Sequence, residues 1–138
     1  MQEVILDSGT LLGIASDSQR CLAIAKWARA NGFPLIVPAV VIAEVVRGGP
    51  SDARINSALK EARQTSTTPR HGRCAGALLA KANGPSTVDA LVMARALLSG
   101  GPATIATGDK DDFDQLLSIA TDIDRLRSGA ARVSVVAV

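Results

Sequence analysis

The stretch V-I-L-D-S-G-T-L-L, residues Val4 to Leu12, decides the fold of this chain. The short apolar run Val4–Leu6 ends at the carboxylate of Asp7, continues through Ser-Gly-Thr and then becomes apolar again. A short apolar run bounded by a turn signal is typical of a buried strand. Asp7 could serve only to cap its own turn. It could equally be the first acid of a metal site at the edge of a parallel sheet, and the rest of the chain decides between the two.

Short apolar segments alternate with helical patterns along the whole sequence. The expected strands are Val4–Leu6, Leu35–Val37, Gln64–Thr68, Ala103–Ala106 and Val133–Val136. The expected helices are Thr10–Ala15, Asp17 or Ser18 to Ala30, Ala39–Arg47, Ser51 or Asp52 to about Arg63, Arg70–Ala82, Ser86–Leu98, Asp111–Leu117 and a turn at Ile123–Arg127. This alternation predicts an α/β fold, a parallel β-sheet of about five strands flanked by α-helices. No linker or repeat interrupts it, so residues 1–138 are expected to form a single domain.

Composition narrows the class of protein further. Hydrophobic residues make up 47% of the 138 residues and charged residues 20%, which indicates a globular chain. Two Phe, one Trp and no Tyr are too few for a protein that stacks single-stranded bases on aromatic rings. The net charge is only +2, but eleven of the 15 basic residues are arginine, which binds phosphate well. If several acids converge on one site, the remaining surface is basic.

The cysteines and the apolar segments indicate a compartment. Cys21 and Cys74 lack the spacing of a metal or redox motif, which predicts free thiols in a reducing environment. The N-terminus lacks the basic start of a signal peptide, and the apolar stretch Leu35–Val46 is too short to span a membrane. The chain is therefore expected to be cytoplasmic, with no membrane partner.

Acidic residues fall where the carboxyl ends of the strands are expected. Asp7 follows the first strand and Asp109 follows the fourth, and parallel sheets bind ligands at that edge. Glu44 lies in the run A-V-V-I-A-E-V-V-R, whose apolar neighbours predict partial burial and so a need for a partner or a metal. Asp89 lies in S-T-V-D-A-L, in the first turn of an expected helix, where an acid can face a ligand at the sheet edge.

Each acid also has an ordinary structural explanation. These are an Asx turn at Asp7, an ion pair between Glu44 and Arg47, a capping box of Ser86 with Asp89, and a cap at Asp109 completed by Asp112. Asp111 and Asp114 crowd the last of these turns, and the helix dipole accounts for only about two of the acids there, at roughly 0.3–1 kcal/mol each. The combination of positions favours a carboxylate site for Mg²⁺, with Mn²⁺ as a substitute.

Other chemistries have fewer of the residues that they need. His71 is the only histidine, so the paired histidines of many zinc sites are absent from the sequence, and a Ser-His-Asp triad would depend on that one side chain. The phosphate-binding pattern G-x-x-x-x-G-K-[ST] is absent as well.

Four segments resemble, in chain order, the acidic motifs of PIN-domain ribonucleases. They are V-I-L-D-S-G-T-L-L, V-V-I-A-E-V-V-R-G, S-T-V-D-A-L-V-M-A-R-A and I-A-T-G-D-K-D-D-F-D-Q-L. Their spacing and the chain length look most like the toxin component of bacterial VapBC toxin–antitoxin systems. The resemblance implies a PIN-like parallel sheet, Mg²⁺- or Mn²⁺-dependent cleavage of RNA and inhibition by a small cognate antitoxin. It also leaves a homodimer open.

The resemblance assigns roles to single residues. Asp7, Asp89 and Asp109 match metal ligands, Glu44 would bind metal through water or orient the nucleophile, and Asp112 matches a further acid. Whether Asp109, Asp111 or Asp112 touches the metal stays open. The hydroxyl positions near metal or phosphate are Ser8, Thr10 and Thr107. Basic residues that could hold RNA phosphates are Arg20, Arg47, Arg70, Arg73 and Lys110.

Two other functions use the same observations. The acids could serve a metal-dependent phosphatase or a DNA-directed nuclease. The chain could also be an inactive PIN-like interaction module, although the acids at all four positions argue against that. Residues 51–84 carry no recognisable motif.

Overall fold

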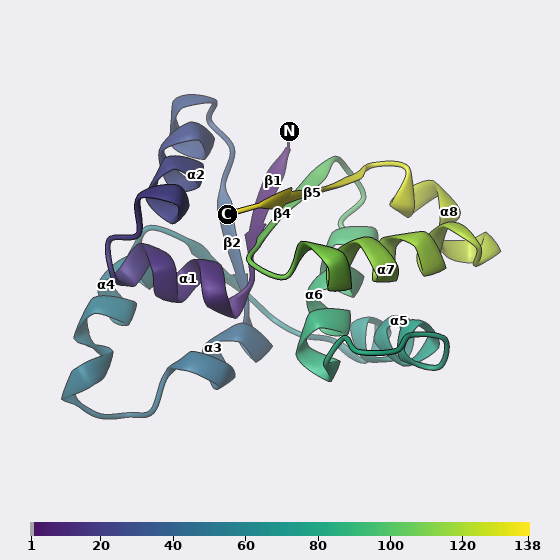
Figure 1. Ribbon diagram of the computed structural model, residues 1–138, viewed down its shortest axis with the longest axis horizontal. Coiled ribbons are helices and arrows are strands. Elements are labelled where there is room, and N and C mark those ends of the chain that lie inside the picture. Colours follow the sequence, from purple (N-terminus) through teal and green to yellow (C-terminus); the bar gives the residue numbers. More distant parts are fainter. Residues whose placement is uncertain (1) are drawn as a thin grey trace.

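The computed structural model describes residues 2–138, and in that range the chain forms five strands and eight α-helices (Figure 1). The strands are β1 (Glu3–Leu6), β2 (Leu35–Pro38), β3 (Arg63–Thr65), β4 (Ala103–Thr107) and β5 (Val133–Ala137). The helices are α1 (Ser8–Ala15), α2 (Gln19–Ala30), α3 (Ala39–Val45), α4 (Ala53–Lys60), α5 (Pro69–Leu79), α6 (Thr87–Leu97), α7 (Lys110–Thr121) and α8 (Asp124–Ala130). A short 3₁₀ turn, Pro50–Asp52, precedes α4.

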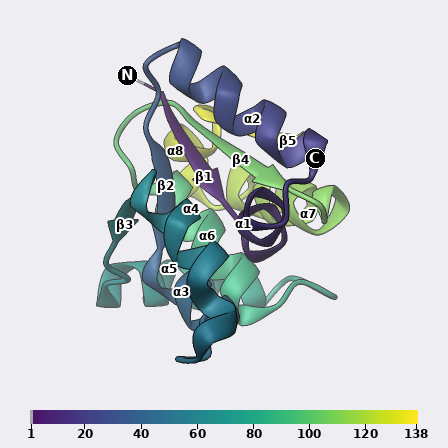
Figure 2. The same ribbon diagram turned by 90° about the vertical axis from the view of Figure 1, so that its left-hand side faces the viewer.

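The five strands form one sheet in the order β3-β2-β1-β4-β5, and every neighbouring pair is parallel. This confirms the expected α/β fold with a parallel sheet flanked by helices. Figures 1 and 2 show α1, α2 and α4 on one face of the sheet and α6, α7 and α8 on the other. Because both faces are covered, the strands carry apolar side chains on both sides, and Ile5, Ile36 and Ile105 are at most 1% exposed.

The strand order contains a topological switch point. The chain builds outward from β1 to β2 and β3, then crosses back to place β4 and β5 on the other side of β1. In the β1–β4 pair Leu6 lies opposite Ala106, so Asp7, just after β1, and Thr107, the last residue of β4, lie side by side at the carboxyl ends of the two strands. Open α/β sheets bind ligands at such a point, outside the carboxyl ends of the strands.

The middle of the chain differs from the sequence prediction. The helix expected to reach about Arg63 ends at Lys60, and the strand expected over Gln64–Thr68 is the shorter β3. Thr68 caps α5 instead, because its hydroxyl accepts from the amide of His71 while the His71 ring accepts from the amide of Thr68 at 3.0 Å. This reciprocal capping box starts the helix, so Thr68 belongs to the helix cap and not to the strand.

Helix α3 ends at Val45, two residues before the predicted end. The buried carboxylate of Asp52 accepts from the amides of Arg47 at 3.0 Å and Gly48 at 2.7 Å. Those amides are therefore committed to the loop rather than to the helix, and Val46 turns into an extended conformation. Helix α7 is longer than the predicted Asp111–Leu117, because its buried stripe continues to Ala120.

No helix within residues 2–138 has the length and apolar character needed to cross a membrane.

Candidate active site

Asp7 lies at the switch point and is held there by two hydrogen bonds. It caps α1, and its Oδ1 accepts from the amide of Thr10 at 2.8 Å. Its Oδ2 accepts from the hydroxyl of Thr107 at the end of β4, and the residue is only 5% exposed. The same Thr107 oxygen accepts from the amide of Asp109 at 2.8 Å. One hydroxyl group therefore joins the buried acid after β1 to the acidic segment after β4.

Glu44 is reached from α1 through Ser8. The Ser8 hydroxyl donates to Oε1 of Glu44, and this links the first turn of α1 to α3. The expected partial burial of Glu44 is wrong, because the residue is exposed near the end of a short helix. Nor does Arg47 pair with it among the described residues, since Arg47 Nη1 donates to the carbonyls of Ala43 at 3.2 Å and Val46 at 3.0 Å. Glu44 therefore faces solvent with a serine donor beside it.

Asp89 has two roles. It belongs to a capping box, and it also belongs to the set of acids Asp7, Asp89, Asp109 and Asp112, which is called the acidic group below. Ser86 Oγ accepts from the Asp89 amide, and Asp89 Oδ2 accepts from the Ser86 amide, both at 3.1 Å. Burial raises the pKa of Asp89, and the negative charges of Asp109 and Asp112 raise it further, against the lowering effect of the Ser86 hydrogen bonds. The capping interpretation is thus confirmed, and the same side chain also lies within electrostatic reach of two acids from the next segment.

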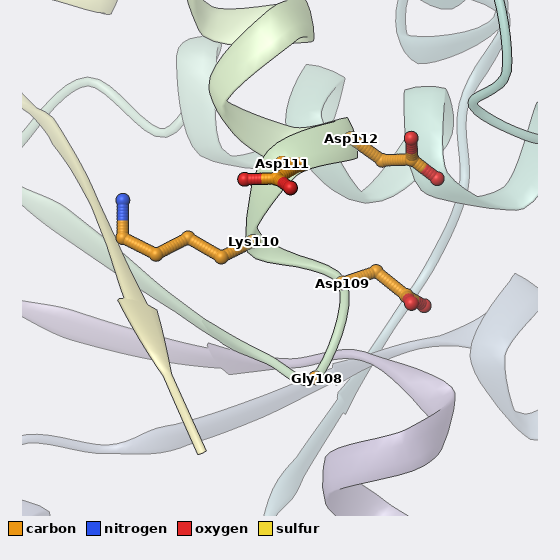
Figure 3. Close-up of a pocket in the computed structure, with 5 residues that line it drawn as sticks. All are labelled: Gly108, Asp109, Lys110, Asp111 and Asp112. Atoms are coloured by element: carbon orange, nitrogen blue, oxygen red, sulfur yellow. The ribbon is translucent and has the colours of Figure 1, made fainter.

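The charged side chains at the start of α7 point to two different sides of the segment. A cavity of about 300 Å³ at the start of this helix is lined by Gly108, Asp109, Lys110, Asp111 and Asp112. Figure 3 shows the side chains of Asp109 and Asp112 pointing to one side of the segment and Lys110 pointing to the other. Lys110 pairs with Asp114 at 2.6 Å. Asp109 stands at the N-cap position of α7 as expected, but its side chain makes no capping hydrogen bond, so its carboxylate is free for another role.

The three predicted hydroxyl residues differ in what they contact. Ser8 is half-buried and donates to Glu44. Thr10 and Thr107 are fully buried; the Thr10 hydroxyl donates to the carbonyl of Ala106 at 2.7 Å, and Thr107 donates to Asp7. The expected phosphate contact of Thr10 and Thr107 has no support in this geometry, because both hydroxyl groups are used inside the protein.

The predicted basic residues also separate. Arg20, Arg70 and Arg73 are exposed on α2 and α5. The guanidinium group of Arg47 is engaged with the end of α3, and Lys110 is engaged with Asp114. Exposed arginines rather than these two are therefore available to a phosphate.

The donor set fits a hard divalent cation. Asp7, Asp89, Asp109 and Asp112 offer only oxygen atoms, which Mg²⁺ and Mn²⁺ prefer. Within residues 2–138 no three acidic, histidine or cysteine side chains stand close enough together to hold an ion as they are placed. Asp7 nevertheless keeps acceptor capacity beyond its two hydrogen bonds, and the mutual repulsion acting on Asp89 is the effect that a cation would relieve.

Sequence reasoning missed two contacts that support these acids. The Gln115 amide group is hydrogen-bonded to the backbone of Asn83, in the loop before α6, at 2.7 and 2.9 Å. Arg95 on α6 binds the carboxylate of Glu3 through two bonds of 3.0 Å and so ties α6 to the start of β1. Both contacts join residues far apart in the chain, and no local sequence pattern announces them.

Comparison with known proteins identifies a matching family and two solved structures of similar fold. The family model of the PIN domain matches residues 4–116. Among solved structures, the chain is similar to VapBC2 from Rickettsia felis bound to a DNA fragment from its promoter, with a TM-score of 0.71, 12% identity and coverage of 100% of this chain and 99% of that one. It is also similar to FitAB bound to an IR36 DNA fragment, with a TM-score of 0.59, 16% identity and coverage of 97% and 94%. None of the curated proteins matches the sequence.

Proposed function

Because this chain belongs to the PIN-domain family, we propose that it is a metal-dependent endoribonuclease and acts as the toxin of a type II toxin–antitoxin pair. The observation that supports the proposal is the connection between acids of separate segments near the carboxyl ends of β1 and β4. Asp7 and the backbone of Asp109 are joined through Thr107, and the charges of Asp109 and Asp112 act on Asp89. A capping role alone does not explain why acids from three segments are connected in this way.

Asp7, Asp89 and Asp109 are the proposed ligands of the ion, and Asp112 is a further acid of the same group. When bound, Mg²⁺ or Mn²⁺ supplies Lewis acidity toward the phosphodiester and the attacking water. The protein supplies orientation. Thr10 and Thr107 fix the Asp7 carboxylate, and the capping box fixes the first turn of α6 that carries Asp89.

Glu44 is proposed to orient the attacking water or to accept its proton. Its exposure leaves one face of the carboxylate open to solvent, and the Ser8 hydroxyl holds one of its oxygens. A positioned carboxylate within hydrogen-bond reach of water is the usual requirement for such a base. Arg20, Arg70 and Arg73 are candidates for binding RNA phosphates, because they are exposed and basic.

A small cognate antitoxin is the proposed partner. The proposal is supported by the two similar structures, whose names describe VapBC2 and FitAB assemblies bound to DNA. These likenesses extend over nearly the full length of both chains, so the fold that would present a partner surface is shared. A homodimer is compatible with the proposal, and the expected compartment is the cytoplasm.

Cleavage assays test the enzymatic part. The purified chain is incubated with structured RNAs in Mg²⁺ or Mn²⁺, and again with excess chelator. Internal cleavage that depends on the ion is expected, and sequencing of the new 5′ ends gives the target. Cleavage that continues in chelator rules out the metal mechanism. Hydrolysis of small phosphate esters without RNA cleavage supports a phosphatase, and preferential cutting of DNA supports a DNA-directed nuclease.

Growth assays test the toxin part. Expression of the chain alone is expected to arrest growth, and co-expression with a short neighbouring reading frame is expected to restore it and to co-purify a complex. Normal growth during expression of the active enzyme, without any bound neighbour, contradicts the toxin assignment. An Asp7→Asn variant expressed at the same level serves as the control for toxicity unrelated to cleavage.

A further inference from the structure

The side chain of Gln115 acts as a clamp between two segments that carry acids. Its Oε1 accepts from the amide of Asn83 at 2.7 Å, and its Nε2 donates to the carbonyl of Asn83 at 2.9 Å. The two bonds satisfy both backbone groups of one loop residue, as a neighbouring strand would do. Gln115 belongs to the second turn of α7, and Asn83 belongs to the loop that leads into α6.

The clamped loop lies directly against an acid of the candidate site. Gly84, next to Asn83, has φ of +113°, a conformation that favours glycine. A Cβ atom on Gly84 would stand 3.5 Å from Oδ1 of Asp112. Asp112 and Gln115 are three residues apart on α7 and therefore share one face of the helix. On that face Gln115 contacts the backbone of the loop, and the charge of Asp112 acts on Asp89.

The same loop fixes the start of α6. Pro85 is buried, and Ser86 then opens the capping box that holds Asp89. Asp89 follows Asn83 by only six positions, so a loop held at Asn83 also fixes the first turn of α6. Gln115 thus connects the segment bearing Asp89 to the helix bearing Asp112, which the repulsion between these two like charges would otherwise push apart.

We infer that Gln115 is a positioning residue that holds the segments bearing Asp89 and Asp112 together, so that both acids can contribute to binding a divalent cation. This inference rests on the proposed function. Gln115 itself touches neither substrate nor ion in this assignment. Its two hydrogen bonds hold the loop and α7 together against the repulsion between the acids, and thereby preorganise the site before an ion binds.

Two variants remove the clamp with different side effects. Gln115→Ala removes the whole side chain beyond Cβ, and Gln115→Met keeps the length of the side chain but neither hydrogen bond. Gln19→Ala, at an exposed position on α2, is the matched control. Mn²⁺ alone is the probe. The measurements are the Mn²⁺ concentration that gives half of the full rise in Tm, the Mn²⁺ concentration for half-maximal RNA cleavage, and the Tm without metal.

Both clamp variants are expected to need about tenfold more Mn²⁺ in the two titrations, as is usual when a residue supporting metal ligands is lost. Gln19→Ala is expected to match the wild type. If the clamp variants melt earlier without metal but keep the wild-type Mn²⁺ midpoints, the inference is overturned, because Gln115 then only stabilises the loop. If Gln115→Ala does not fold, Gln115→Met alone decides.

Different results contradict the proposed ribonuclease function and the inference about Gln115. A wild type that binds Mn²⁺ but leaves RNA intact contradicts the proposed ribonuclease, while the Mn²⁺-dependent rise in Tm still tests Gln115. A wild type that cleaves RNA with the same Mn²⁺ midpoint as Gln115→Met contradicts only the inference. A wild type that neither responds to Mn²⁺ nor cleaves RNA contradicts both.

Discussion

The hydroxyl of Thr107 donates a hydrogen bond to the buried carboxylate of Asp7, and this bond joins the carboxyl ends of β1 and β4. The same oxygen accepts from the amide of Asp109. The acid that ends the first strand and the acid that follows the fourth are therefore oriented by one side chain between them.

Thr107→Val tests this link. Valine has nearly the same shape as threonine but leaves the Asp7 carboxylate and the Asp109 amide each without one partner. Loss of a partner for a buried polar group costs about 1–3 kcal/mol, so the free energy of unfolding in urea is expected to fall by that amount, together with RNA cleavage. Thr104→Val on the same strand is the control, because its hydroxyl contacts only Gln2. Equal losses of stability and activity in the two variants contradict the assignment.

Asp89→Asn tests whether Asp89 only caps α6 or also belongs to the acidic group. Asparagine can still accept the hydrogen bond from Ser86, but it removes one of the mutually repelling charges. Without metal the variant is expected to melt at the same temperature as the wild type or higher. Addition of Mn²⁺ is expected to raise the Tm of the variant less than that of the wild type. An ion that binds only the folded state stabilises it more when the ion binds more tightly. Asp122→Asn, at an exposed position after α7, should behave as the wild type does.

The pH dependence of stability follows from the raised pKa of Asp89. The folded chain holds this proton more tightly than the unfolded chain, so the contribution is fully present below the ordinary carboxyl pKa and is lost as pH rises through the raised value. Metal-free wild type is therefore expected to lose stability over that acidic range more than Asp89→Asn does. Urea unfolding of both proteins at several pH values measures this difference. If the free energy of unfolding changes with pH equally in the two proteins, Asp89 does not have a raised pKa in the folded chain.

Ser8→Ala tests the support of Glu44. Removal of the hydroxyl frees the carboxylate to take other rotamers, but because the bond is exposed to solvent, its loss has little effect on stability. RNA cleavage is expected to fall about tenfold or more, while the free energy of unfolding changes by less than about 0.5 kcal/mol, as at most surface sites. Adding Ser8→Ala to Glu44→Gln should cost little further activity. Ser16→Ala, at the exposed end of α1, is the control, and a similar loss in that variant would refute the Ser8 role.

Asp111 and Asp112 form a matched pair on one helical turn. Asp112 points with Asp109 toward the candidate site, and its charge acts on Asp89, so Asp112→Asn is expected to weaken Mn²⁺ binding and RNA cleavage. Asp111→Asn is expected to leave both nearly unchanged. Mn²⁺ titrations followed by Tm compare the two variants directly. A larger effect from Asp111→Asn would reverse the assignment of the ligand.

The fold and the positions of the acids were predictable because they depend on local signals. Apolar runs predicted four of the strands closely, and a parallel sheet brings the ends of β1 and β4 to one edge whatever the intervening sequence. The capping box at Asp89 was likewise visible in four consecutive residues.

The predictions that were wrong concern the exposure of one side chain and contacts between residues that are distant in the sequence. Glu44 was expected to be partly buried because its sequence neighbours are apolar, but the buried face of α3 carries Val41 and Val45 and leaves Glu44 exposed. The end of α3 is set by Asp52, which accepts hydrogen bonds from the amides of Arg47 and Gly48 in the loop that follows the helix. Gln115 gave no signal at all, since its partner lies 32 residues away.

The crossover that places β4 beside β1 also sets the order in which the molecule can be completed during translation. Asp7 and Thr107 are 100 residues apart, and a ribosome that adds about 5–20 residues per second needs on the order of ten seconds to cover that interval. Until β4 is synthesised, β1 has no neighbour on its other edge, and Asp109 does not yet exist. A nascent chain is therefore unable to bring these acids together before the segment that follows β4 has left the ribosome.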